Sequence, residues 1–200
     1  MRAASCGGWW TSSGRGEPMG ERAIQRLNWG CGTEPPEGWI NCDVKEGPGI
    51  DISCDIRAGL PLEDSSLDYA TSIHALPELP YPDVEPALAE LRRVLKPGGP
   101  LRLGLPDLDR AIRAYREEDA GYFLIPDDEA RSLGGKLIVQ MTWYGWSRSL
   151  YTFDFIEELL YRAGFRRVVR SAHGQTSSEH DEIATLDNRE RESLFVEAFK

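Results

Sequence analysis

The fold of this chain is decided by the stretch RLNWGCGTEPPEGWINCDV, residues 26–44. An apolar run at 24–29 predicts a β-strand, and Gly30-Cys31-Gly32 predicts a tight turn where a ligand can approach the backbone. Pro35 and Pro36 then prevent the helix that usually follows a nucleotide-binding glycine turn. A second strand is expected at 39–43.

This turn lacks the features that bind phosphate groups. A dinucleotide site has a third glycine in GxGxxG, where this chain has Pro35, and a helix N-terminus that faces the pyrophosphate. A P-loop needs Gly-Lys followed by Ser or Thr, which is missing after the turn. We therefore expect a nucleoside-like ligand that has no phosphate to satisfy.

Short apolar runs alternate with helical patterns along the chain, which predicts an α/β sandwich. Helices are expected at 83–95, where Asp83 is a candidate N-cap, at 107–118, and between Thr152 and Gly164. Seven strands are expected, at 24–29, 39–43, 50–55, 67–73, 100–107, 165–170 and 192–199.

One connection in this scheme is too short. Only six residues separate Gly32 from Trp39, whereas a parallel crossover normally needs about a dozen. Either the first helix is reduced to a single turn, or the strand limits differ from those expected.

The bulk composition favours one globular domain. The length is 200 residues and the net charge is −10, which disfavours a nucleic-acid partner. Arg102, Arg110, Arg113 and Arg116 are close in sequence, and we interpret them as a solvated helix face. No apolar run reaches membrane-spanning length, so no membrane association is expected.

The termini and cysteines suggest a cytoplasmic protein. Residues 1–18 are expected to be a disordered extension without the apolar core of a signal peptide, and Met19 is an alternative start. The domain would then span 19–200. None of the four cysteines forms a CxxC pair, so no metal site is expected. Those after Cys6 lie in strand-like stretches, where thiols are usually small buried hydrophobes: Cys31, Cys42 and Cys54.

A glycine and three polar residues mark the carboxyl ends of several expected strands. Gly30, Asp43, Asp55 and His74 each follow or end one. In open parallel sheets ligands lie beyond these ends. The carboxylate of Asp43 can accept from ribose hydroxyls and that of Asp55 from an adenine amino group. The alternative is that both are ordinary turn residues, but the combination favours a site.

Several stretches together resemble a known family. They are LNWGCG, GWINCDV, DISCDIRAGLPLEDSSLDYATSIHALPEL, ELRRVLKPGG and LDNRERESLFVEAF. In order and spacing they look like the small class I S-adenosylmethionine-dependent methyltransferases, of the methyltransferase type 11 kind. The resemblance implies a three-layer, Rossmann-like sandwich. Its seven-stranded sheet is mostly parallel, with one antiparallel strand near the C-terminus.

The resemblance also implies S-adenosylmethionine as cofactor and a set of residues that bind it. The glycine turn would pass under the methionine and ribose parts, Asp43 would hold the ribose and Asp55 the adenine. Asn28 stands where the family often carries an acidic residue. The full expected set is Asn28, Gly30, Cys31, Gly32, Asp43, Val44, Asp55, Ile56, Ser72, Ile73 and His74.

Candidate catalytic residues follow the fourth strand. Methyl transfer is an in-line displacement, in which an oxygen or nitrogen acceptor can need a base. His74 is one candidate, with a cofactor-wall residue as the alternative role. Family members often carry HxLEH where this chain has HALPE, which makes Glu78 a second candidate. Asp107 is expected to cap the next helix.

An insertion around 120–150 is expected to cover the substrate. It holds Trp143, Tyr144 and Trp146, which could stack on a substrate ring, and Arg148, which could bind an acidic group. The alternative is an apolar patch that closes the domain or buries a homodimer contact.

Three functions are compatible with the sequence. The leading hypothesis is a methyltransferase that moves a methyl group to an oxygen or nitrogen of a small molecule. The first alternative is a cofactor-binding protein of the same fold without catalysis. A nicotinamide-dependent oxidoreductase is the second alternative, and Pro35 speaks against it.

Overall fold

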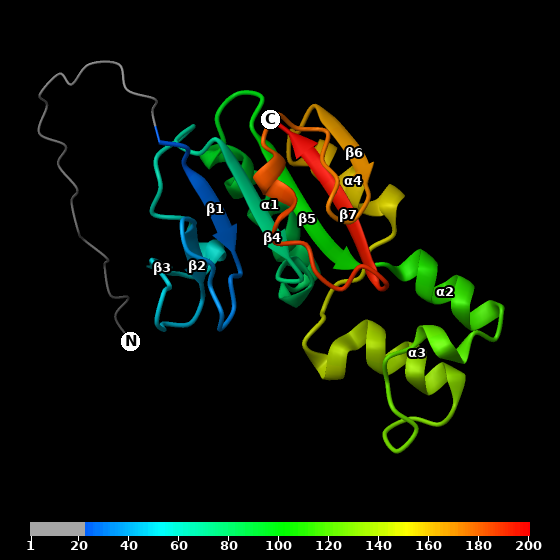
Figure 1. Cartoon of the computed structure of the whole chain (residues 1–200). Coiled ribbons are helices and arrows are strands. Elements are labelled where there is room, and N and C mark those ends of the chain that lie inside the picture. The colour runs from blue at the N-terminus through cyan, green and yellow to red at the C-terminus, as the bar shows by residue number, and fades with distance from the viewer. Residues whose placement is uncertain (1–22) are drawn as a thin grey trace, which may run out of the picture.

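The computed structural model describes residues 23–200, so the expected extension at 1–18 and Met19 lie outside the described residues. The centre of the molecule is a seven-stranded sheet in the order β3-β2-β1-β4-β5-β7-β6 (Figure 1). The strands are β1 (Arg26–Trp29), β2 (Ile40–Asp43), β3 (Ile52–Ser53), β4 (Tyr69–Ile73), β5 (Pro100–Pro106), β6 (Arg167–Ser171) and β7 (Ser193–Phe199).

The strand directions confirm the expected topology. β1 pairs in parallel with β2 and β4, and β5 pairs in parallel with β4. β7 is antiparallel to both of its neighbours, β5 and β6. The carboxyl ends of β1, β2, β4 and β5 therefore meet at one edge of the sheet, where ligands bind in open α/β folds.

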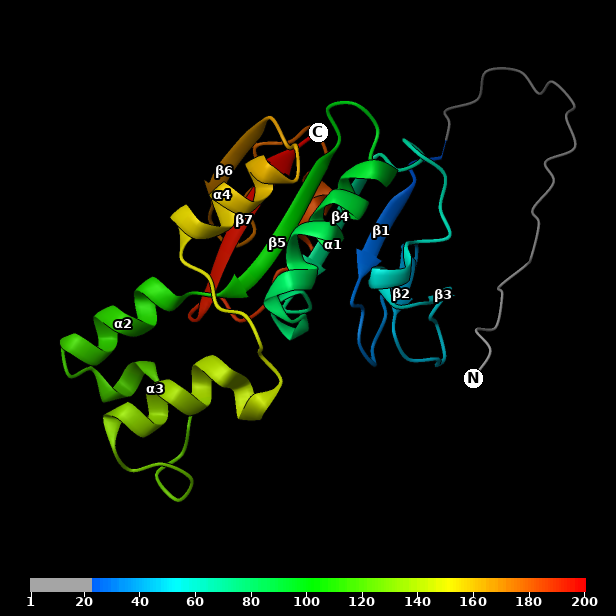
Figure 2. The ribbon, with the colours of Figure 1, turned by 180° about the vertical axis from the view of Figure 1, so that it is seen from behind.

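Two helices cover one face of the sheet (Figure 2). They are α1 (Tyr81–Val94) and α4 (Phe153–Arg162), which contact each other. The apolar stripe of each helix packs on strand residues that alternate inward. The main buried cluster includes Leu88 and Leu91 of α1, Leu159 of α4, and Leu103 of β5. This cluster is the hydrophobic core, and it holds the strands whose carboxyl ends form the edge.

The opposite face is covered by the segment 172–192 (Figure 1), which contains one 3-10 helix, η5 (Asp181–Ala184). The hydroxyl of Thr71 in β4 donates to the carbonyl of Ile183. Ile183 also packs with Trp39 and Tyr69 in a second buried cluster. The three expected layers are therefore present, with an irregular segment as the third.

Arg102 of β5 holds this segment against the sheet. Its guanidinium is fully buried and forms ion pairs with Asp187 at 2.5 Å and with Glu197 of β7 at 2.8 Å. It also donates to the carbonyls of Ala172 and Gln175. The expectation that Arg102 belongs to a solvated helix face is wrong, because it lies on a central strand opposite two carboxylates.

The elements at the carboxyl edge differ in part from the expectation. The link from β1 to β2 contains turns and no helix, so the short connection is real. α1 begins at Tyr81, which places Asp83 in its first turn rather than at its cap. The hydroxyl of Thr152, the N-cap residue of α4, makes no capping bond.

Two further helices lie beyond the carboxyl end of β5 and pack against each other (Figures 1 and 2). They are α2 (Leu108–Arg116) and α3 (Leu133–Thr142). Asp107 caps α2 by accepting from the backbone N–H of Arg110, as expected. The insertion around 120–150 is more regular than its sequence indicated, since α3 has ten residues. Among residues 23–200, no helix has the length and apolar character needed to cross a membrane.

Replacing Arg102 should destabilise the fold strongly. We expect Arg102→Met to lower the free energy of unfolding by about 3–5 kcal/mol, because two buried carboxylates lose their counter-charge. Urea denaturation measures this loss. The matched control is Arg166→Met at an exposed position, with a change below about 0.5 kcal/mol. A loss of less than about 1 kcal/mol for Arg102→Met would contradict the anchoring role.

Candidate active site

A cavity of about 690 Å³ lies at the carboxyl ends of the first four strands. Its walls come from the glycine turn after β1, the loop after β2, the segment after β3 and the segment after β4. Trp143, Trp146 and Arg148, from the insertion, complete the lining. Elements far apart in the sequence therefore converge on one hollow.

The glycine turn is tied closely to the end of β2. The backbone N–H groups of Gly30 and Cys31 donate to the carbonyl of Cys42 at 2.8 and 3.1 Å. Gly30 has a φ of +74°, and a Cβ at this position would lie 2.1 Å from the Cβ of Ala75. No other residue fits here, because any side chain would collide with the segment that follows β4.

Asp43 connects this turn to the loop after β2. Its Oδ2 accepts from the backbone N–H of Gly32 at 3.0 Å, and its Oδ1 from that of Lys45 at 3.0 Å. A carboxylate has about four acceptor positions, so both oxygens can accept further hydrogen bonds on the cavity side. Asp43 is thus oriented by the backbone and still able to bind hydroxyl groups.

Asp55 lies at the start of the 3-10 helix η1 (Ile56–Ala58) and is held by Arg57. Its carboxylate accepts from the backbone N–H of Arg57 at 3.0 Å and pairs with the guanidinium at 2.5 Å. Hydrogen bonds from Arg57 lower the pKa of Asp55. Asp55 is therefore an ionised, oriented acceptor in the cavity wall, next to the apolar side chain of Ile56.

Of the eleven residues expected to bind a cofactor, eight line the cavity: Gly30, Gly32, Asp43, Val44, Asp55, Ile56, Ile73 and His74. Asn28, Cys31 and Ser72 are not part of the lining. The amide of Asn28 donates to Asn41 at 3.1 Å between β1 and β2. Ser72 is fully buried, and its hydroxyl has no hydrogen-bond partner.

His74 lines the cavity with a neutral imidazole. Its Nε2 lies 2.9 Å from the hydroxyl of Ser193, which itself donates to the carbonyl of Asn188 at 3.3 Å. Nε2 is then the donor of this pair, and Nδ1 keeps its lone pair. Burial, and next the positive charge of Arg189, lower the pKa of His74 to about 3.

Glu78 occupies a different part of the same wall. Its side chain lines the cavity. Partial burial and the nearby charge of Asp43 raise the pKa of Glu78, while Lys45 and Arg148 act in the opposite direction. Of the two expected catalytic residues, Glu78 is the one whose pKa is raised, whereas the pKa of His74 is lowered.

The insertion reaches the cavity through the segment after α3. The backbone N–H groups of Arg148 and Ser149 donate to the carbonyl of Pro77 at 2.7 and 3.1 Å. The ammonium of Lys45 lies 5.8 Å from the centre of the Trp146 ring. Tyr144 points elsewhere, because its hydroxyl donates to Glu129 at 2.5 Å and it is not part of the lining.

Several lining residues were not expected from the sequence. They include Trp29, Lys45, Glu46, Cys54, Arg57 and Ala75. All lie within a few residues of the end of a strand. Their position near the strand ends was therefore the one signal in the sequence that could have identified them.

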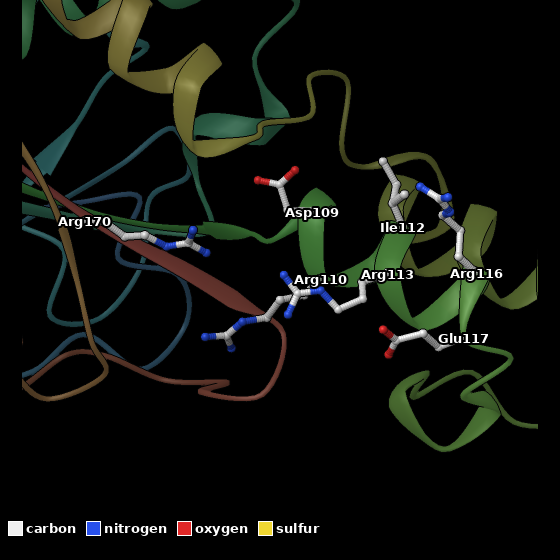
Figure 3. A pocket seen from close by; sticks show the side chains of 7 residues that line it. All are labelled: Asp109, Arg110, Ile112, Arg113, Arg116, Glu117 and Arg170. Carbon is white, nitrogen blue, oxygen red and sulfur yellow. The ribbon is translucent and has the colours of Figure 1, made fainter.

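A second hollow, of about 820 Å³, contains none of the expected site residues. Figure 3 shows Arg170 of β6 extending toward the arginines of α2. Arg110 and Arg170 both form ion pairs with the buried Asp107, at 3.2 and 3.1 Å. Within residues 23–200, Arg113 and Arg116 form no ion pair. One side of this acidic chain is therefore locally basic.

Within the described part of the chain, no group of three or more His, Cys, Asp or Glu residues is arranged to hold a metal ion.

Comparison with known proteins agrees with this geometry. Residues 31–103 match a family model described as a methyltransferase domain. The matched residues run from the glycine turn to the middle of β5, and so include most of the cavity wall.

Relatives and solved structures extend the comparison. A demethylmenaquinone methyltransferase from Staphylococcus haemolyticus is 32% identical over 127 residues, which cover 60% of this chain and 50% of that protein. The chain spans half or less of the length of the curated relatives it matches.

Two solved structures of S-adenosylmethionine-dependent methyltransferases share the fold. That from Thermotoga maritima has a TM-score of 0.56 and 22% identity, over 88% of this chain and 82% of that chain. That from Archaeoglobus fulgidus has a TM-score of 0.57 and 14% identity, over 88% of this chain and 86% of that chain. The fold is that of the class I S-adenosylmethionine-dependent methyltransferases.

The fold and the family match imply S-adenosylmethionine as the cofactor, and the residues present fit it. The glycine turn leaves room for a ligand at Gly32, where a Cβ would meet nothing within 4 Å, and no helix follows the turn to offer its N-terminus to a phosphate. The two strand-end carboxylates that face the cavity suit the hydroxyl and amino groups of a nucleoside.

The neutral state of His74 should make stability depend on pH. His74 protonates near its ordinary value of 6.5 in the unfolded chain but only near 3 in the folded one. Its contribution to stability is therefore complete above about pH 6.5 and declines as the pH falls toward 3. Relative to His74→Gln, the wild type should lose stability in urea denaturation between pH 7 and about 5. Parallel pH profiles for the two proteins would contradict the assignment.

Proposed function

We propose that this protein is an S-adenosylmethionine-dependent methyltransferase that transfers a methyl group to an oxygen or nitrogen of a small molecule. The observation that carries the proposal is the cavity at the carboxyl edge. There, Asp43 and Asp55 face one hollow beside a glycine turn that offers no phosphate site.

Each wall of the cavity has a role in holding the cofactor. Asp43 accepts from the ribose hydroxyls, while its existing bonds to Gly32 and Lys45 keep it oriented. Asp55 accepts from the adenine amino group, and Ile56 packs on the ring. The cofactor supplies a methyl group on a sulfonium, which is an electrophile that an oxygen or nitrogen lone pair can attack in line.

The acceptor binds on the side of the cavity formed by the insertion. Trp143 and Trp146 offer aromatic faces there, and Arg148 offers a guanidinium. Arg189 lies 4.8 Å from the centre of the Trp143 ring, which fixes one side of this wall. An acceptor with a flat ring and an acidic group suits this lining.

Glu78 is the better candidate for a base in this geometry. A general base works best when its pKa lies near the working pH. The pKa of His74 is about 3, so its imidazole is a weak base, and its Nε2 is occupied by Ser193. The pKa of Glu78 is shifted upward, toward the working range. We assign His74 to the cofactor wall and proton acceptance to Glu78.

A cofactor-binding protein without catalysis is the second candidate. It is favoured by the side chain of Asn28, which bonds to Asn41 and leaves the lining without the acidic residue common at this position. Turnover separates the two functions. Formation of S-adenosylhomocysteine with any acceptor of a metabolite panel would end the second candidate. The panel should include demethylmenaquinone, which the name of the Staphylococcus haemolyticus relative indicates.

Cofactor affinity should depend on both strand-end carboxylates. We expect Asp43→Ala and Asp55→Ala each to weaken S-adenosylhomocysteine binding about 10- to 100-fold in calorimetry, because each removes a hydrogen bond to a charged acceptor. Asp109→Ala, in the arginine-lined hollow, is the matched control with the same change of charge. Unchanged affinity in both site variants would refute the cofactor site.

Once an acceptor is found, Glu78→Gln should reduce turnover by about 10²–10⁴-fold with little change in cofactor affinity, because the amide cannot take up a proton. The wild-type rate should fall as the pH is lowered through the raised pKa of Glu78. Glu46→Gln is the control, since Glu46 is another acidic residue of the lining. Equal rates for Glu78→Gln and wild type would remove Glu78 from the mechanism.

A further inference from the structure

Two cysteines that the sequence suggested were small buried hydrophobes lie together at the cavity. The Sγ atoms of Cys42 in β2 and Cys54, just after β3, are 3.7 Å apart. Cys42 is buried, whereas Cys54 is half-buried and lines the cavity. One thiol is therefore open to small reagents, and the second lies directly behind it.

Each cysteine immediately precedes one of the two carboxylates of the proposed cofactor site. Cys42 is followed by Asp43, and Cys54 by Asp55. The backbone carbonyl of Cys42 also accepts from Gly30 and Cys31, so its position supports the glycine turn. A covalent bond between the two sulfurs would tie together the wall that runs from Asp43 to Ser53.

The two thiols differ in reactivity. The hydrogen bond between the two thiols lowers the pKa of Cys54 and raises the pKa of Cys42. Thiolates are the reactive form toward oxidants. Cys54 therefore has the features of an attacking thiol, and Cys42 those of a resolving thiol.

We propose that Cys42 and Cys54 form a reversible disulfide with hydrogen peroxide or an organic hydroperoxide, and that this disulfide weakens cofactor binding. The coupling to cofactor rests on the proposed function. A disulfide has an S–S distance of about 2.05 Å, so the sulfurs must approach each other from 3.7 Å. This approach moves Cys42 and Cys54, and because each is bonded to the aspartate that follows it, Asp43 and Asp55 shift as well.

The chemistry balances with peroxide as the oxidant. The Cys54 thiolate attacks one peroxide oxygen, the O–O bond breaks, and a sulfenic acid and hydroxide form. The Cys42 sulfur then attacks the Cys54 sulfur, the S–S bond forms and the S–O bond breaks. The protons of the two thiols leave in two molecules of water. Two thiols lose two electrons in all, and one peroxide gains them.

The first test is peptide mapping of the full chain by mass spectrometry after treatment with hydrogen peroxide, without reductant. We expect a peptide linked through Cys42 and Cys54, which dithiothreitol separates. It should be missing in Cys54→Ser and present in Cys31→Ser, a matched control at a nearby thiol. Over-oxidation of Cys54 without a linked peptide, or linkage through Cys6 or Cys31 instead, would overturn the proposal.

The second test measures the coupling to the cofactor. Oxidised protein should bind S-adenosylhomocysteine about ten-fold more weakly than reduced protein, and dithiothreitol should restore the affinity. By linkage, S-adenosylhomocysteine should slow formation of the linked peptide. Equal affinity of the two forms would overturn the coupling. Failure of the reduced protein to bind at all would contradict the proposed function instead, while peptide mapping would still decide whether the disulfide forms.

Discussion

The burial of Arg102 between Asp187 and Glu197 constrains one whole face of the sheet. That face has no long helix to cover it, so the segment 172–192 takes this place and needs an anchor. The same segment ends beside the cavity, where burial and then the positive charge of Arg189 lower the pKa of His74. The ion pair between Arg102 and Asp187 thus holds the segment that carries Arg189 to the carboxyl edge. The stability of the fold and the position of Arg189 both depend on the guanidinium of Arg102.

The short link between β1 and β2 constrains the carboxyl edge of the sheet. Because no helix fits between them, the glycine turn is stabilised by the carbonyl of Cys42 and by the carboxylate of Asp43. The same carboxylate is the proposed partner of the ribose. Pro35 and Pro36 therefore remove a phosphate site and bring an acidic side chain directly behind the turn.

Much of this arrangement could be predicted from the sequence, because strands and their ends leave local patterns. The seven strands and the carboxylates at the ends of β2 and β3 follow from alternation and from residue types at strand ends, whereas the antiparallel β7 was implied by the family resemblance. The buried Arg102, the side chain of Asn28 turned toward Asn41, and α3 could not be predicted. Each depends on partners or packing distant in the sequence, and a single chain gives no local signal for such partners.

The turn after α3 contains two aromatic residues in a backbone conformation that favours glycine. Trp143 and Tyr144 have φ values of +43° and +56°, although neither is glycine. The left-handed conformation costs about 1–2 kcal/mol for each residue with a side chain. Glycine would remove this cost, as it does at Gly145 with a φ of +92°. The Trp143 ring is therefore held at a cost in backbone strain, and what the ring touches is the cavity and the guanidinium of Arg189.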